Sequence, residues 1–154
     1  MRDKKIWIFN AGNAFDGNPK WLFMYIVNYR KDITPYWFCY TEETRNYIRK
    51  LGYQAFLFKS KMAEKIGSQA GVYVVNQKKE VFQDYLKGIT VLNLWHGVGC
   101  KTVEKGVTYG FLNERIIKKH IINMDCYQNY QLFLVTSPLM EKHFIKQCDL
   151  AEDK

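Results

Sequence analysis

The chain has 154 residues, of which 47% are apolar and 25% are charged, a balance that suits one globular domain and argues against disorder. Lysine and arginine number 23 against 15 acidic residues, so the formal charge of +8 favours anionic partners such as phosphates, nucleic acid or an acidic membrane surface. No apolar run reaches the roughly 18 residues of a transmembrane helix, and the four cysteines form no CxxC pair, which argues against a zinc or disulfide framework and favours reduced cytoplasmic thiols.

The amino-terminal third of the sequence predicts a buried strand followed by a helix. Residues 6–9 form a short apolar run that ends at a turn of small polar residues. Asn18 and Pro19 then have the residue types of a helix cap and a first helical position, which predicts a helix to about Tyr29. We expect this helix to be well buried because apolar residues lie on most of its sides: Trp21, Leu22, Phe23, Tyr25 and Ile26.

Further strands and helices alternate along the rest of the chain. Predicted strands cover residues 35–40, 53–58, 72–75, 89–94 and 131–135. The first of the predicted helices begins after a Thr41 cap, has Glu42 and Glu43 where they favour the helix dipole, and ends near Gly52. The second runs from Ser60 to Ile66, with Gly67 as its end. The third runs from Asn113 to Met124, with Ile117, Ile121 and Met124 on one stripe, and the fourth from Pro138 to Gln147. This alternation predicts a single α/β domain over residues 1–154, with a Rossmann-like parallel sheet and helices on both of its faces.

The segment from Val91 to Lys101 carries the strongest candidate chemistry. A buried strand runs into Trp-His-Gly-x-Gly-x-Lys, so His96 stands at a carboxyl end, where parallel sheets bind ligands. An imidazole can act as a general base near neutral pH, Gly97 and Gly99 let a ligand approach the backbone, and Lys101 adds positive charge. We predict a phosphate-side loop with a catalytic histidine. The alternative is a structural histidine bonded to a backbone carbonyl, with glycines that serve only the turn.

The loop from Asn10 to Asn18 is a weaker candidate for anion binding. It is rich in small polar residues and precedes a helix N-terminus, whose free N–H groups attract anions. Asn18 is therefore a candidate phosphate ligand. The alternative, which the residues alone favour, is that this loop is only a cap and a turn.

Other functional classes find little support in the sequence. His120 lies beside two lysines and His143 lies in Glu-Lys-His, and both patterns are typical of a solvated helix face. Neither HExxH nor another ligand spacing is present, so we expect no metal site and no cofactor. No RRM or KH signature occurs, so nucleic acid is not an expected partner.

Three segments resemble the CDP-glycerol glycerophosphotransferase family, whose members polymerise or prime teichoic acids and related polyol-phosphate polymers. Residues 94–101 resemble its (Q/L)xWHGxxxK segment, although Val98-Gly99 stands where the family often has Thr-Pro. Residues 10–23 resemble its Gly…Asn-x-Lys-x-Leu-Phe stretch, which places Lys20 beside Asn18 among the phosphate-binding candidates. Residues 132–137 resemble its strand-then-serine segment, so the likeness covers nearly the whole chain in order.

The resemblance implies the amino-terminal half of a GT-B transferase with two Rossmann-like domains. The carboxyl-terminal nucleotide-binding domain of the family is absent, so we expect the isolated chain to be inactive. The implied reaction transfers a polyol phosphate from CDP-glycerol or CDP-ribitol to a hydroxyl group of a teichoic-acid-like or capsular acceptor. His96 would be the general base, while Lys101 and the backbone at Gly97 and Gly99 would face phosphate.

The resemblance also implies where such a protein works and with what. The acceptor would be an anionic polyol-phosphate polymer or a lipid-linked primer, and the CDP-polyol would bind through the missing domain. We expect a cytoplasmic protein, with peripheral contact to the inner face of the membrane. Two alternatives are a nucleotide-sugar glycosyltransferase of the same architecture and a non-catalytic module that binds anionic polymer.

Overall fold

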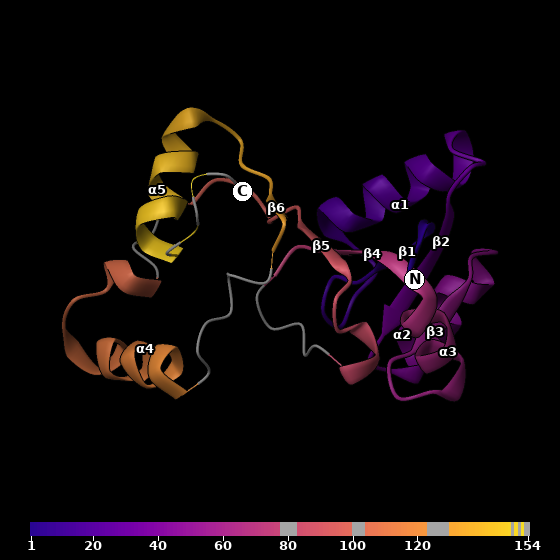
Figure 1. The fold of residues 1–154 in the computed structure, drawn as a ribbon, viewed down its shortest axis with the longest axis horizontal. Helices are drawn as coiled ribbons and strands as arrows, with labels where there is room; N and C mark the ends of the chain where they lie inside the picture. The colour runs from indigo at the N-terminus through magenta and orange to yellow at the C-terminus, as the bar shows by residue number, and fades with distance from the viewer. Residues whose placement is uncertain (78–82, 100–103, 123–129, 149, 151, 153–154) are drawn as a thin grey trace. The chain divides into compact units, whose positions relative to one another are not determined.

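The computed structural model describes residues 1–77, 83–99, 104–122, 130–148, 150 and 152, and the chain divides into two compact units, Met1–His96 and Gly97–Lys154. The elements in chain order are β1 (Asp3–Phe9), α1 (Gly17–Tyr29), β2 (Thr34–Cys39), α2 (Glu42–Lys50), β3 (Ala55–Leu57), α3 (Lys61–Gln69), β4 (Ala70–Val75), η1 (Asp84–Leu86), β5 (Thr90–Asn93), η2 (Glu104–Gly106), α4 (Gly110–Ile122), β6 (Leu132–Phe133) and α5 (Pro138–Cys148) (Figure 1). The expectation of one domain over residues 1–154 stays a prediction.

The sheet of the first unit confirms the predicted Rossmann-like fold. Its strand order is β3-β2-β1-β4-β5, and each neighbouring pair is parallel. The chain moves outward from β1 to β3 and then crosses back to β4 on the other side of β1. The carboxyl ends of β1 and β4 therefore flank the point at which the strand order reverses, which is where open α/β sheets bind ligands.

Helices cover both faces of this sheet, as predicted. On one face, Phe23 and Ile26 of α1 and Ile48 of α2 join Phe9 and Trp37 of the strands in one buried cluster. On the other face lies α3, which crosses from β3 to β4, and Figure 1 shows α1 and α3 on opposite sides of the sheet. This arrangement follows from right-handed crossovers that run in opposite directions along the sheet.

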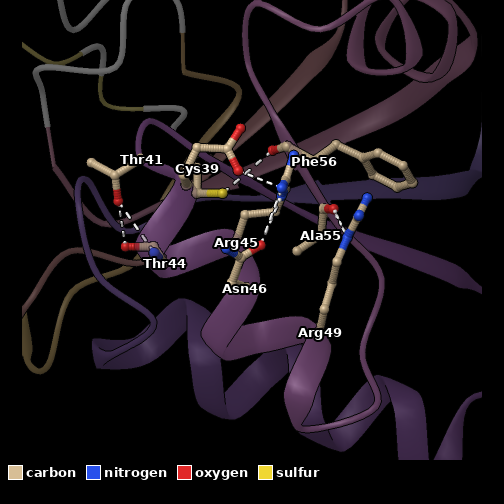
Figure 2. A network of polar contacts seen from close by, with 9 residues as sticks. Cys39, Thr41, Thr44, Arg45, Asn46, Arg49, Ala55 and Phe56 are labelled. Atoms are coloured by element: carbon tan, nitrogen blue, oxygen red, sulfur yellow. Dashed lines mark hydrogen bonds and ion pairs between the residues drawn. The ribbon is translucent and has the colours of Figure 1, made fainter.

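Helix α2 begins as the sequence predicts. The hydroxyl of Thr41 accepts the backbone N–H of Thr44 at 3.2 Å, which satisfies one of the free donors of the first turn. Near the other end of the helix, Arg49 Nε donates to the carbonyl of Ala55 at 2.9 Å and ties α2 to β3 (Figure 2). The cap and the arginine thus fix both ends of the helix.

The first helix differs from its prediction in its start and in its burial. α1 begins at Gly17, with Asp16 at the cap position, so Asn18 is not the cap. The expectation of a well-buried helix is wrong, because the side chains of Trp21 and Tyr25 are 64% and 53% exposed. A helix that lies on one face of a sheet buries only the stripe that faces the strands, whatever the residues on its other sides.

The third helix does not end at Gly67. α3 continues to Gln69, and Gly67 lies inside it. A Cβ atom at Gly67 would stand 2.4 Å from Cδ2 of Tyr85, so the glycine is needed for the close approach of η1 and not for a helix end. Gly67 therefore indicated close packing against η1 and not the end of the helix.

The second unit contains α4, β6 and α5. The rings of Tyr130, Phe133 and Phe144 form a contacting series whose centroids lie 6.1 Å and 5.4 Å apart. All three side chains are buried. The Ile117 side chain on the predicted stripe of α4 is 47% exposed, and Met124 falls outside the described residues.

One guanidinium fixes the amino-terminal edge of the sheet. Arg2, just before β1, donates to four backbone carbonyls: Gly67 and Ala70 through Nη1 at 2.6 and 2.8 Å, and Tyr85 and Lys87 through Nη2 at 2.9 and 2.7 Å. Partial burial lowers the pKa of Arg2. The planar guanidinium group of arginine is suited to this task because its four Nη protons point outward in one plane.

Replacement of Arg2 by lysine should lower the free energy of unfolding by about 1–3 kcal/mol, since an ammonium group cannot reach the four carbonyls together. Urea denaturation measures this loss. The matched control is Arg30→Lys, because the Arg30 side chain bonds the exposed carboxylate of Asp32, and replacement of an exposed ion-pair partner should cost much less. Equal effects of the two substitutions would contradict the role assigned to Arg2.

Candidate functional site

The carboxyl-terminal edge of the sheet contains the buried polar side chains of the described residues. Asn10 follows β1, Asn76 follows β4 and Asn93 ends β5, and their exposed fractions are 0%, 3% and 0%. Asn10 is satisfied locally: its Nδ2 donates to the carbonyl of Phe38 at 2.9 Å, and its Oδ1 accepts the N–H of Gly12 at 2.9 Å. Uncharged amides are thus gathered at the point where the strand order reverses.

His96 lies at this edge and bonds the main chain through one ring nitrogen. The backbone N–H of Leu94 donates to the carbonyl of Val75 at 2.7 Å, which continues the ladder between β4 and β5. His96 Nδ1 then lies 2.9 Å from the carbonyl oxygen of Asn76. A carbonyl oxygen only accepts, so the proton of the neutral ring is on Nδ1 and a lone pair is left on Nε2.

The His96 ring combines the two alternatives that the sequence left open. It bonds a backbone carbonyl, as a structural histidine would, yet the residue is exposed. No residue in the described part of the chain hydrogen-bonds its Nε2. The ring is therefore oriented by one nitrogen and open to an incoming group at the other, which is the arrangement that a general base needs.

Trp95, just before His96, has an unusual backbone conformation. Its φ of +49° lies in the left-handed region, which a bulky residue rarely adopts. Its N–H donates to Oδ1 of Asn93 at 2.8 Å, and its indole stacks on the imidazole of His96 with ring centroids 4.1 Å apart. Strained residues of this kind gather at functional sites, where the surrounding contacts hold them.

Asn18 reaches this segment from the first turn of α1. Its Nδ2 donates to the carbonyl oxygens of Leu94 and Trp95, at 3.0 Å in both cases. Two residues that lie far apart in the sequence and that we named as site candidates, Asn18 and His96, are thus brought to the same edge of the sheet. Phosphate binding by Asn18 stays a prediction, because both of its amide protons are used by the main chain here.

Gly17 permits the close packing of the first helix on Asn76. It has a φ of +62°, and a Cβ atom there would lie 2.7 Å from Nδ2 of Asn76. Because the carbonyl of Asn76 holds His96, the start of α1 supports the imidazole through Gly17 as well as through Asn18.

The other predicted phosphate ligands lie in different surroundings. Lys20 is half-buried, and its Nζ lies 5.5 Å from the ring centre of Phe15 and 5.0 Å from that of Trp21, within the range of cation–π contacts. Gly97 has a φ of +135°, a conformation that favours glycine. Lys101 falls outside the described residues.

Gly99 packs closely within the second unit. A Cβ atom at this position would lie 3.0 Å from Cζ of Phe144 and 3.2 Å from Nε2 of His143, both on α5. The absence of a side chain at Gly99 therefore permits close packing on α5, in addition to the predicted role of this residue beside phosphate.

Sequence reasoning missed Asn76 and Asn93. Each follows or ends a run of buried apolar residues, so the signal was an amide at the carboxyl end of a predicted strand. In the described residues, no group of three or more His, Cys, Asp or Glu side chains is arranged to hold a metal ion.

Comparison with known families gives one match over the whole chain. The family model described as CDP-Glycerol:Poly(glycerophosphate) glycerophosphotransferase matches residues 1–154. No protein of curated function matches the chain.

Solved structures with a similar fold are those of the wall teichoic acid polymerase TagF. The chain matches one TagF structure with a TM-score of 0.76 and 16% sequence identity, over 99% of this chain and 37% of that one. It matches a histidine-to-asparagine variant with a TM-score of 0.77 and 14% identity, over 99% and 37%, and a histidine-to-alanine variant with 0.74 and 17%, over 99% and 38%. The chain thus spans a little over a third of these structures, and the likeness shows a shared fold.

Substitution of Gly17 by alanine should destabilise the protein more than the same substitution at Gly52. Both glycines have positive φ, but a Cβ at Gly52 meets nothing within 4 Å, whereas one at Gly17 meets Asn76. We expect a loss of about 1 kcal/mol at Gly52 from backbone strain and about 1–3 kcal/mol more at Gly17 from overpacking. Equal losses in urea denaturation would contradict the proposed support of Asn76 by α1.

Proposed function

Because this chain belongs to the CDP-glycerol:poly(glycerophosphate) glycerophosphotransferase family, we propose that it is the amino-terminal, acceptor-side domain of a transferase that builds a teichoic-acid-like or capsular polymer. The enzyme would transfer polyol phosphate from a CDP-polyol, CDP-glycerol or CDP-ribitol, to a hydroxyl group of the acceptor. The polymerase TagF, whose structures share this fold, is named for wall teichoic acid.

The geometry of His96 is the observation that carries this proposal. Its Nδ1 is engaged by the Asn76 carbonyl, and its Nε2 has a lone pair on an exposed ring at the carboxyl edge of the sheet. A base of this kind accelerates proton transfer by about 10²–10⁴-fold when the proton lies within hydrogen-bond reach.

The proposed step forms one P–O bond and breaks another. The acceptor hydroxyl oxygen attacks the β-phosphorus of the CDP-polyol while its proton passes to Nε2 of His96. The bond between the β-phosphorus and the bridging oxygen breaks, and CMP leaves with the bond electrons. The product is a phosphodiester between acceptor and polyol, so atoms and charge balance.

Positive charge and backbone donors would stabilise the phosphate oxygens as the bonds change. We assign this role to Lys101 and to the backbone N–H groups at Gly97 and Gly99, with Lys20 on the other loop. Donors preorganised around developing charge are worth more than donors that must reorient during the reaction. The formal charge of +8 also favours approach of an anionic polymer.

The donor-binding part of the enzyme would lie outside this chain. The TagF chains that share the fold are more than twice as long as the matched region. We propose that a second Rossmann-like domain holds the CDP group, that these 154 residues alone are inactive, and that no resident cofactor is needed.

The proposed setting is the cytoplasm, with peripheral contact to the inner face of the membrane where a lipid-linked acceptor would be presented. Among the described residues, every helix falls short of the length and hydrophobicity of a membrane span. The exposed rings of Trp21, Tyr25 and Tyr29 on α1 support a surface contact of this kind, since aromatic side chains favour the membrane–water interface.

Replacement of His96 by alanine in the complete natural protein that contains this chain should reduce turnover by about 10²–10⁴-fold, because the acceptor hydroxyl loses its base. The measurement is CMP release from CDP-glycerol and from CDP-ribitol with a polyol-phosphate acceptor. Circular dichroism should show an unchanged fold, since the exposed ring contributes little to the core.

The matched control is His120→Ala, which removes another imidazole and should leave turnover unchanged. Near-normal CMP release by a folded His96→Ala variant would contradict the role of the base. Faster UDP release from UDP-sugars than CMP release from CDP-polyols would instead favour a glycosyltransferase. Polymer binding without turnover, indifferent to His96, would favour a binding module.

A further inference from the structure

We propose that Asn18 is a positioning residue for His96: its amide holds the backbone of Trp95 in the left-handed conformation from which the imidazole is aimed. This inference rests on the proposed function for its catalytic consequence and on the structure for its geometry. It gives Asn18 a role through the main chain of another segment, in place of direct contact with substrate.

The first step is that Trp95 needs external support. Its φ of +49° is disfavoured for any residue with a Cβ atom, and more so for one with a large ring. A residue in this region returns to negative φ unless neighbouring groups hold it. The support must therefore be found in contacts to the Trp95 backbone.

Two asparagines supply that support through the two peptide units that flank the Cα atom of Trp95. Asn93 Oδ1 accepts the Trp95 N–H at 2.8 Å, and Asn18 Nδ2 donates to the Trp95 carbonyl at 3.0 Å. The same Nδ2 also donates to the carbonyl of Leu94 at 3.0 Å. Asn93 belongs to the strand that leads into the segment, whereas Asn18 is 77 residues away in the sequence and anchors the segment to α1.

The second step connects this backbone to the base. The His96 ring stacks on the indole of Trp95 at an interplanar angle of 28° and bonds the Asn76 carbonyl through Nδ1. The direction of Nε2 is fixed only while Trp95 keeps its conformation, because a change in φ there would turn both rings. A misplaced base loses rate while the rest of the substrate still binds.

The chemistry required of residue 18 is specific. Two protons on one planar nitrogen must reach two carbonyl oxygens, which the amide of asparagine can do. Aspartate has nearly the same shape but only acceptor oxygens when ionised, so its charge would face two carbonyl oxygens. Asn18→Asp should therefore be at least as harmful as Asn18→Ala, whereas a residue that merely fills space would tolerate the aspartate.

The test compares Asn18→Ala, Asn18→Asp and the control Asn28→Ala in the complete natural protein. Asn28 is exposed on the same helix and has no side-chain hydrogen bond recorded within the described residues. Three quantities are measured for each variant: kcat for CMP release, KM for CMP release, and the rate of amide hydrogen exchange at Trp95.

We expect both Asn18 variants to lower kcat by about 10–100-fold with KM changed less than about 3-fold, since placement of the base is lost but binding is kept. Exchange at Trp95 should become about 10-fold faster as its hydrogen bond to Asn93 opens more often. Asn28→Ala should change none of the three quantities.

Three kinetic outcomes and one exchange outcome would overturn the proposal. Wild-type kcat in Asn18→Ala would show that the amide does not position the base. A rise in KM with unchanged kcat would show direct contact with substrate. An equal loss in Asn28→Ala would show a general effect on α1. If His96→Ala keeps its activity, the proposed function is contradicted. If amide exchange at Trp95 is unchanged in Asn18→Ala, the positioning role of Asn18 is contradicted, whatever the function of His96.

Discussion

The site depends on one hydrogen bond, between Nδ1 of His96 and the carbonyl oxygen of Asn76. The parallel ladder of β4 and β5 ends with the bond from Leu94 to Val75, and the next carbonyl along the chain, that of Asn76, receives an imidazole in place of a backbone N–H. Because that carbonyl can only accept, the bond fixes which nitrogen holds the proton as well as the plane of the ring. A backbone interaction thus sets both the tautomer and the orientation of the proposed base.

The two edges of the sheet are held by different chemistry, and the difference suits their tasks. At the amino edge, the guanidinium of Arg2 hydrogen-bonds four backbone carbonyls and holds these segments together. At the carboxyl edge, the groups are amides of Asn10, Asn18, Asn76 and Asn93. Amides both donate and accept hydrogen bonds without a charge that must be desolvated, so they can be buried at the carboxyl ends of the strands.

The sequence predicted the fold because the fold follows from local patterns. The alternation of apolar strands with helices gave the parallel sheet, and Thr41 predicted its helix start through a capping bond that depends on neighbours in the chain. The exposure of Trp21 and the continuation of α3 through Gly67 were not predictable, because both depend on which surface a helix meets. Tertiary contacts determine those features, and the spacing of apolar residues in the sequence does not reveal these contacts.

The same division applies to the candidate site. His96 was predictable from its place at the end of an apolar strand, and the fold places it at the expected edge. The partners that hold it were not: the carbonyl of Asn76 carries no sequence signal, and the bond from Asn18 to Trp95 spans 77 residues. Residues that act through the main chain of a distant segment are found from coordinates, whereas residues that carry the chemistry themselves can be found from type and position.

The tautomer of His96 is the most direct test of this account. The ring nitrogens of ¹⁵N-labelled histidine are measured by NMR at a pH where the imidazole is neutral, and a His96→Gln variant identifies the signals among the three histidines of the chain. The account predicts a proton on Nδ1 and a bare Nε2. A His96 ring with its proton on Nε2 would contradict it, because that nitrogen could then not accept the proton of an alcohol.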